Sequence, residues 1–282
     1  MSEGIPFSRL NMFLIFFWAI LKTITPFSLV PIHKSFFSLL YNKQLRLFIS
    51  ILLVMSFAGC GKSEENANAQ SKDKKEIVVG VSPAPHKEIM EKAAEILEKE
   101  GYKIKIVEFN DYQMPNIALS EGDIDANFFQ HVPFLNKTNS EKKLNLDYTV
   151  KVHIEPMGVY SNKIKDIKEL KDGAVISVPN DPTNEARALR LLEKAGLIKL
   201  KSGELVTKVD ITENPKKYDI QEIEAAQLPR TLNDVDISVI NTNFALSAGL
   251  NPLKDALLIE DKDSPYANVL AVRKEDKDKD YI

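Results

Sequence analysis

After residue 75 the chain repeats a strand-like run, an amphipathic helix and a second strand-like run, which is the pattern of a βαβ unit. In the first copy the run EIVVGV at 76–81 precedes a helix predicted over 86–100, and an alternating strand follows at 102–107. The helix carries apolar side chains at helical spacing on one face and ends just before Gly101. A crossover helix requires its two strands to lie parallel, in a sheet that helices cover on its faces. The chain is therefore predicted to be an α/β protein.

A second set of α/β elements follows later in the chain. Its predicted strands span 174–178, 219–224 and 236–240. A helix is predicted at 183–195, and an extended stretch at 150–160 separates the two sets. This organisation predicts two lobes joined by crossing segments, with lobe 1 formed by 76–160 plus 245–282 and lobe 2 formed by 161–244. A fold of this kind binds its ligand between the lobes, at the carboxyl ends of strands.

The N-terminal region, residues 1–59, is apolar and aromatic and ends in the pattern of a lipoprotein export signal. Basic Lys43 and Arg46 precede an apolar run, which leads through Ala58 and Gly59 to Cys60, the only cysteine of the chain. The run is too short to span a membrane stably. We expect cleavage before Cys60, a diacylglycerol on its thiol, and attachment to a membrane on the extracytoplasmic side of the cell envelope. The alternative is a buried cysteine at the end of an apolar helix.

The segments on either side of this signal are unlike it. Residues 60–75 are polar and Asn-rich, as in a flexible, lipid-anchored linker. Residues 1–40 hold a further apolar stretch that Lys22 and two prolines interrupt. We expect synthesis to begin near residue 40; the alternative is an additional hydrophobic anchor.

The composition excludes several classes of function. The net charge is −3, with both signs interspersed, so nothing indicates a nucleic-acid partner. One cysteine allows no disulfide within the chain and no thiolate metal cluster, and the four histidines are scattered without metal-ligand spacing. We predict neither a cofactor nor a metal.

Two stretches carry side chains suited to a binding pocket. The first places Tyr112, Phe129, His131 and Phe134 where strand-like residues meet a proline that can begin a helix. These side chains can wall a pocket for an apolar, polarisable group. The plainer alternative is that the aromatics belong to the core and that His131 is a buried histidine with its hydrogen bonds satisfied.

The second stretch, VPNDPTNEAR at 178–187, combines a strand end, a turn and a helix start. Free backbone N–H groups and the positive end of the helix dipole favour an anion there. Arg187, within the first turns, can bind a carboxylate through two parallel bonds. The alternative is a surface arginine paired with Glu185 or Asp181. Asn241 and Asn268, in two further stretches, would supply neutral hydrogen-bond partners; asparagines at strand ends usually satisfy their own backbone instead.

Seven motifs in order resemble the NlpA family of lipoproteins, which includes the substrate-binding proteins of bacterial methionine importers. They are FNDY (109–112), LSEGDIDANFFQH (119–131), VPNDPTN (178–184), AGLIKLKSG (195–203), QLPR (227–230), VINT (239–242) and DSPYAN (263–268). The resemblance covers almost all of 76–275. It implies a type II periplasmic-binding fold, whose two α/β lobes close on an amino acid. It implies no catalysis.

The resemblance also implies roles for the candidate residues. Tyr112, Phe129, His131 and Phe134 would line the side-chain pocket for L-methionine, with Phe134 standing where many relatives have Tyr. Arg187 would bind the carboxylate, and Asn241 and Asn268 would bind the polar backbone atoms of the ligand. The partners would be an ABC permease with its ATPase, and a membrane reached through the lipid on Cys60.

Three other interpretations stay open at this point. The same fold can bind a short methionine peptide or another apolar amino acid. An enzyme would have to use Asp123, Asp125 and His131 as an acid–base set, without an accompanying nucleophile. Finally, relatives continue past the position of Glu275, where this chain has a charged run that ends at Ile282. We therefore also consider that lobe 1 is truncated and exposes an apolar patch, and that the chain is a paralogue that does not bind a ligand.

Overall fold

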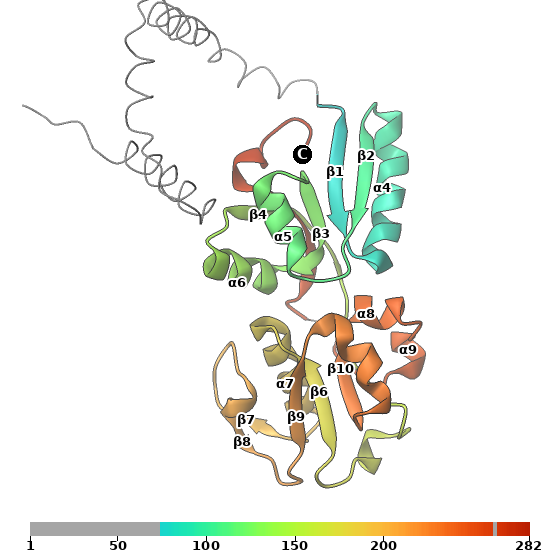
Figure 1. Cartoon of the computed structure of the whole chain (residues 1–282), viewed down its shortest axis with the longest axis vertical. Coiled ribbons are helices and arrows are strands. Elements are labelled where there is room, and N and C mark those ends of the chain that lie inside the picture. The colour runs from blue at the N-terminus through green and yellow to red at the C-terminus, as the bar shows by residue number, and fades with distance from the viewer. Residues whose placement is uncertain (1–73, 262–263) are drawn as a thin grey trace, which may run out of the picture. The chain divides into compact units, whose positions relative to one another are not determined.

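Two β-sheets organise the residues that the computed structural model describes, which are 74–261 and 264–282 (Figure 1). The predictions on the export signal, on Cys60 and on residues 1–40 lie outside these described residues. Both sheets mix parallel with antiparallel strands and have helices packed against them. The predicted α/β class is confirmed.

The first sheet has the strand order β2-β1-β3-β12-β4. Its strands are β1 (Glu76–Val81), β2 (Lys103–Glu108), β3 (Ala126–His131), β4 (Leu146–Ile154) and β12 (Ala267–Arg273). β1 pairs in parallel with β2 and with β3, as the βαβ pattern predicted, and β12 is antiparallel to both β3 and β4. β12 thus returns from late in the chain to lie between β3 and β4, which come more than a hundred residues earlier.

The second sheet has the order β11-β5-β10-β6-β9. Its strands are β5 (Gly158–Tyr160), β6 (Val175–Pro179), β9 (Asp219–Ile223), β10 (Ile237–Ile240) and β11 (Leu258–Ile259). A small separate ribbon pairs β7 (Lys199–Leu200) with β8 (Ile211–Glu213). β5 and β11 pair in the second sheet, although the sequence analysis had put their residues in lobe 1. The exact division into lobes stays a prediction.

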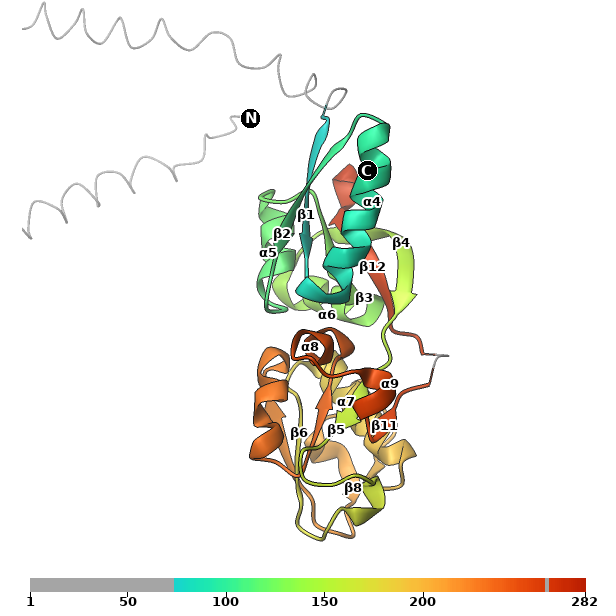
Figure 2. The same cartoon turned by 90° about the vertical axis from the view of Figure 1, so that its right-hand side faces the viewer.

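Helices bury the two faces of the first sheet (Figure 2). A short π-type turn, η2 (Pro83–Lys87), leads into α4 (Glu88–Lys99), and Ile89 and Ala93 of this helix pack against Ile77 and Val79 of β1. The opposite face is covered from α5 (Met114–Glu121) and α6 (Val132–Lys142), with Leu119 and Leu135 in its core. The core therefore has a layer on each side of the sheet.

The helices near the second sheet start or end next to strand ends. They are α7 (Pro182–Lys194), α8 (Thr242–Ser247) and α9 (Pro252–Asp255), with 3-10 turns η3 (Ile167–Glu169), η4 (Lys208–Asp210) and η5 (Ala225–Asn233). α7 begins as predicted, with Pro182 in its first turn and Asp181 accepting a hydrogen bond from the backbone N–H of Asn184. One face of α7 is buried in the core through side chains such as Leu189 and Leu192.

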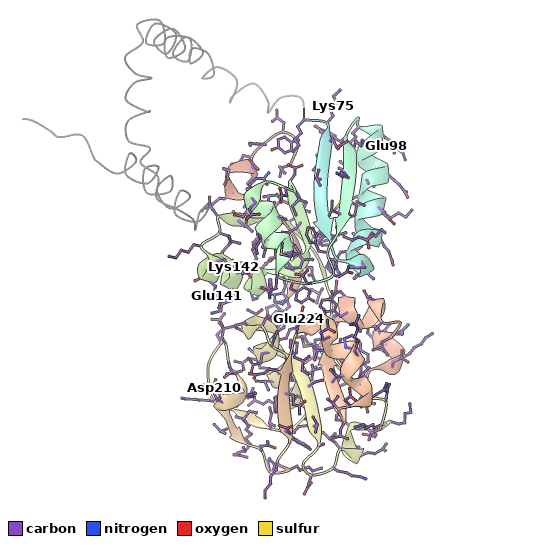
Figure 3. All side chains as sticks on the ribbon, viewed as in Figure 1. Lys75, Glu98, Glu141, Lys142, Asp210 and Glu224 are labelled. Atoms are coloured by element: carbon purple, nitrogen blue, oxygen red, sulfur yellow. The ribbon has the colours of Figure 1, made fainter. Side chains whose placement is uncertain are left out.

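Charged side chains lie mainly on the surface; of those labelled in Figure 3, Lys75, Glu98 and Glu224 are exposed. The C-terminal charged run is partly an exception. Its 3-10 turn η6 (Lys274–Asp276) buries Asp276, whose carboxylate pairs with Arg273 and Lys279. The guanidinium of Arg273 also donates hydrogen bonds to the backbone carbonyl of Leu119, in the last turn of α5, and to that of Ile124, just after this helix. The run is thus anchored to the first lobe by buried polar contacts.

One apolar surface remains on the edge strand β4. Val150, Val152 and Ile154 alternate along this strand and are 50%, 43% and 37% exposed. The pairing of β4 with β12 skips Val152, so a bulge interrupts the alternation there and the three side chains do not all lie on one face.

Candidate functional site

A pocket gathers all seven side chains that the sequence analysis selected for ligand binding. Twelve residues line it: Tyr112, Phe129, Gln130, His131, Phe134, Glu155, Asn184, Arg187, Asn241, Thr242, Asn243 and Asn268. They come from β3, α6, β12 and the loop after β2 on one side, from α7 and the β10–α8 junction on the other, and from the segment after β4, which supplies Glu155. Because strand and helix ends of both sheets converge here, the pocket lies where the two-lobe pattern predicted a ligand.

Three aromatic rings form the apolar wall. Tyr112, Phe129 and Phe134 have centroids 5.6–5.9 Å apart in tilted or edge-on arrangements. Phe244 of α8 adds a fourth ring 4.8 Å from Tyr112. Such edge-on packing is the favoured geometry of aromatic groups. Tyr112 also donates a hydrogen bond to Asn243 Oδ1 at 2.6 Å, which links the loop after β2 to α8.

His131 is buried and has a defined tautomer. Its Nδ1 accepts a hydrogen bond from the backbone N–H of Phe134 at 3.1 Å, so that His131 caps α6. The proton of the neutral ring therefore lies on Nε2, which faces Asn184 Oδ1 at 3.2 Å. Burial lowers the pKa of His131 to about 3, and the positive charge of Arg187 acts in the same direction. His131 is thus a neutral hydrogen-bond donor at physiological pH.

A chain of amides continues from this contact. Asn184 Nδ2 donates to both carboxylate oxygens of Asp181, at 3.0 and 2.9 Å, so its Oδ1 must be an acceptor. Asn241 Nδ2 donates to that Oδ1 at 2.8 Å. Within the described part of the chain, the buried Oδ1 of Asn241 and Nδ2 of Asn243 then have no hydrogen-bond partner. These two buried atoms offer a ligand a free acceptor and a free donor.

Arg187 is 4% exposed and supplies the positive charge of the pocket. Its Nε donates to the Glu260 carboxylate at 3.0 and 3.1 Å, while Nη2 contacts that carboxylate and donates to the Glu155 carbonyl at 2.7 Å. Tyr266 stacks on the guanidinium 4.3 Å away. The alternative of a surface arginine paired with Glu185 or Asp181 is therefore wrong. Glu260 orients Arg187 and offsets part of its charge.

Asn268 lies on β12, buried between its neighbours on β3 and β4. The strand register places it opposite His131 on one side and His153 on the other. The free volume of the pocket is only about 20 Å³, which is room for a single water molecule. An amino acid can therefore enter only after the surrounding side chains separate.

Sequence reasoning missed several of these residues. Glu155 lies in the stretch at 150–160, which the sequence predicted only as extended backbone, and Glu260 lies just after β11, a segment for which the sequence analysis predicted no secondary structure. The contact between Glu260 and Arg187 joins segments far apart in the chain, so no local pattern indicates it. Asn184 was within a quoted motif, but its position three residues after Asp181 and three residues before Arg187 did not reveal its link to His131.

The comparisons with known proteins agree with this architecture. A family model described as NlpA lipoprotein matches residues 77–282. The chain belongs to the NlpA lipoprotein family. A D-methionine-binding lipoprotein MetQ of Salmonella typhimurium is 47% identical over 233 residues, which are 81% of this chain and 83% of that protein. Outer membrane lipoprotein 3 of Mannheimia haemolytica is 52% identical over 200 residues, 70% of this chain and 76% of that one.

Solved structures of similar proteins cover both sheets of this NlpA lipoprotein. A nutrient-binding protein from Burkholderia cenocepacia bound to methionine is 49% identical with a TM-score of 0.71, over 73% of this chain and 88% of that one. A periplasmic substrate-binding protein of an ABC transporter from Coxiella burnetii is also 49% identical, with a TM-score of 0.70 over 72% and 86%. The predicted family and the two-lobe periplasmic-binding fold are thus confirmed. Among the described residues, no helix is both long and apolar enough to cross a membrane.

Proposed function

We propose that this NlpA lipoprotein captures methionine outside the cytoplasm and delivers it to the permease of an ABC importer, without chemical change to the ligand. The observation that supports the proposal is that buried polar atoms of the pocket lack hydrogen-bond partners among the described residues and are complementary to an amino acid. The carboxylate of an amino acid would meet Arg187 and Asn243 Nδ2, and its ammonium group would meet Asn241 Oδ1. Buried polar atoms without partners cost free energy, and a zwitterion would satisfy them.

The apolar wall supports a thioether as the side chain. Tyr112, Phe129 and Phe134 meet around the pocket, and each sulfur–aromatic contact contributes about 0.3–1.5 kcal/mol. Several such contacts favour methionine over an alkyl chain of the same length. His131 would donate from Nε2 within this wall, and Asn268 would bind a polar atom of the ligand.

The proposed location of the protein in the cell envelope rests on Cys60. A lipid on its thiol would hold the protein at a membrane, facing the extracytoplasmic side, where the permease and its ATPase form the partner complex. Closure of the lobes on the ligand would mark the loaded state for that complex.

A second candidate ligand is a short methionine peptide. A separate cavity of about 350 Å³ adjoins the pocket and shares Arg187 with it, while Tyr266 and Glu260 form part of its wall. A second residue of a peptide would occupy this volume. Arg187 and Tyr266 stand at the boundary, so their rotation would decide between the two ligands.

The test is thermal unfolding of the full chain in detergent, with L-methionine, D-methionine, leucine and a methionyl dipeptide added separately. Ligand at about 1,000 times its dissociation constant adds roughly 4 kcal/mol, a shift of several degrees. A shift with methionine alone supports the proposal, and a larger shift with the dipeptide supports the second candidate. A cooperative transition that no ligand moves would contradict both.

A further inference from the structure

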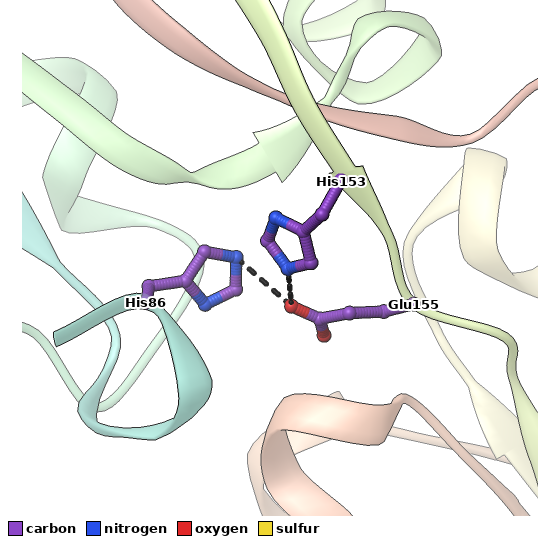
Figure 4. Close-up of side chains that lie close together, drawn as sticks. All are labelled: His86, His153 and Glu155. Atoms are coloured by element: carbon purple, nitrogen blue, oxygen red, sulfur yellow. Dashed lines mark hydrogen bonds and ion pairs between the residues drawn. The ribbon is translucent and has the colours of Figure 1, made fainter. Parts of the chain in front are cut away.

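Three potential metal ligands converge beside the pocket, although they are distant in sequence. His86 belongs to η2, His153 lies near the end of β4, and Glu155 begins the segment that leads to β5 (Figure 4). Glu155 Oε1 lies 3.1 Å from His86 Nε2 and 2.7 Å from His153 Nε2. One ligand atom from each of the three residues lies within 4.8 Å of the others. Two of the four histidines of the sequence, His86 and His153, therefore come together with Glu155 in the folded chain.

The environment of His86 prepares its Nε2 to bind a cation. The ring is wholly buried, and its Nδ1 lies 2.7 Å from Ser82 Oγ, which can accept the Nδ1 proton. Nε2 then directs a lone pair at the carboxylate, and the structure gives it no hydrogen-bond partner among the described residues. In this tautomer two acceptors face each other at 3.1 Å, and a metal ion between them would satisfy both; in the other tautomer Ser82 donates to Nδ1 and Nε2–H faces Glu155.

We propose that His86, His153 and Glu155 bind a divalent transition metal ion of the zinc class. Two imidazoles and one carboxylate are a common zinc ligand set with three protein donors and one open position. Two tetrahedral ligands at about 2.0–2.1 Å from zinc lie roughly 3.3 Å apart. The two contacts of Glu155 Oε1, at 3.1 and 2.7 Å, are close to this value, whereas the widest separation in the cluster, within 4.8 Å, would have to shorten when a metal ion binds. The contact from Ser82 to Nδ1 is the outer contact that orients a metal-bound histidine.

The position of the cluster gives the metal a structural consequence. Glu155 lines the pocket, and its carbonyl accepts the hydrogen bond from Arg187 Nη2. His153 lies on β4 opposite Asn268 of β12. A metal ion would therefore join η2, the end of β4 and the first crossing segment, and would hold one wall of the pocket in place. This inference goes beyond the proposed function and does not depend on which ligand the pocket takes.

The experiment uses the full chain in detergent, first stripped of metal with a chelator and then titrated with Co²⁺ as a spectroscopic probe for zinc. We expect one Co²⁺ per chain with the visible absorption of a tetrahedral site, and its displacement by one equivalent of Zn²⁺. Elemental analysis of the protein after dialysis against Zn²⁺ gives the stoichiometry independently. No stoichiometric binding of either metal would overturn the proposal.

Four variants assign the site. His153→Gln and Glu155→Gln should each weaken Co²⁺ binding by about 100-fold or more, and Ser82→Ala by about 10–100-fold through the orientation of His86. His153 is partly exposed, so its variant is the least disruptive to folding; circular dichroism checks each variant. Glu98→Gln, at an exposed carboxylate of α4 outside the cluster, is the matched control and should bind metal as the parent chain does. Metal binding that survives in His153→Gln and Glu155→Gln, or that is lost in Glu98→Gln instead, would overturn the proposal.

Discussion

Arg187 combines a buried charge, a carboxylate partner and a position in the pocket. The Glu260 carboxylate occupies its Nε and Nη2, so the ligand would approach the remaining edge of the guanidinium. We expect Arg187→Ala to weaken methionine binding by several kcal/mol, because a ligand carboxylate would be buried without its partner. Isothermal titration calorimetry measures this.

The matched control is Arg190→Ala, one turn further along α7. Arg190 lies outside the pocket and contacts the carbonyl of Gly203. Its variant should bind methionine as the parent does. An affinity that is equal in parent and Arg187→Ala would remove Arg187 from the binding site.

Glu185, two residues before Arg187, makes stability depend on pH. Burial raises its pKa to about 7, and Glu222 acts in the same direction, whereas the backbone N–H of Lys208 that bonds to it acts against this. The pKa of Glu185 is higher in the folded chain than its ordinary value of 4.5, so the folded state binds this proton more tightly than the unfolded state does. The contribution of the protonated carboxyl to the free energy of unfolding is therefore fully present below about pH 4.5 and is lost as the pH rises through 7.

Glu185→Gln resembles the protonated state and should remove this dependence. We expect the variant to be more stable than the parent at pH 8, by on the order of 1–2 kcal/mol, and similar to it at pH 5. Urea unfolding at the two pH values measures the difference. Glu193→Gln is the control, since Glu193 lies on the same helix and also accepts a backbone N–H, that of Leu200, but is less buried. A parallel response of the two variants would argue against the raised pKa of Glu185.

At the scale of elements, the start of α7 connects helix capping to the pocket. Asp181 accepts the backbone N–H of Asn184 and holds the Asn184 side chain, which in turn contacts His131 and Asn241. We expect Asp181→Ala to lower stability by about 1 kcal/mol through the lost cap and also to weaken methionine binding, because Asn184 is no longer oriented. Thermal unfolding and calorimetry report the two effects separately.

Asp166 provides a cap of the same kind away from the pocket. It accepts the backbone N–H of Lys168 at the start of η3. Asp166→Ala should therefore lower stability without a change in affinity. If Asp181→Ala behaves in the same way, the amide chain from Asp181 to Asn241 has no role in binding.

At the scale of the whole molecule, access to the pocket requires opening. The free volume of about 20 Å³ is far below the size of an amino acid, and the Tyr112–Asn243 bond joins the two sides. A neutral hydrogen bond contributes about 0.5–1.5 kcal/mol, so Tyr112→Phe should raise the association rate constant for methionine, by up to about 10-fold. Rapid mixing with radiolabelled methionine measures this rate. An unchanged or slower association would mean that another contact limits opening.

Local patterns determined the elements of this protein. The run at 76–81, the helix ending before Gly101 and the α7 start at Pro182 all follow from side-chain periodicity and capping, which act over a few residues. The predicted strand and helix bounds differ from the observed ones by only a few residues. The seven candidate pocket residues also stood in local motifs, which is why the sequence alone could select them.

Contacts between distant segments were decided only by the tertiary structure. The burial of Arg187 against Glu260, the placement of β5 and β11 in the second sheet and the meeting of His86 with Glu155 all depend on which strands pair. Strand order and the path of the crossing segments are set by the summed burial of the whole chain. A short stretch of neighbouring residues does not contain this information. The sequence therefore indicated the pocket residues, but not the charged residues Glu155 and Glu260 that contact Arg187.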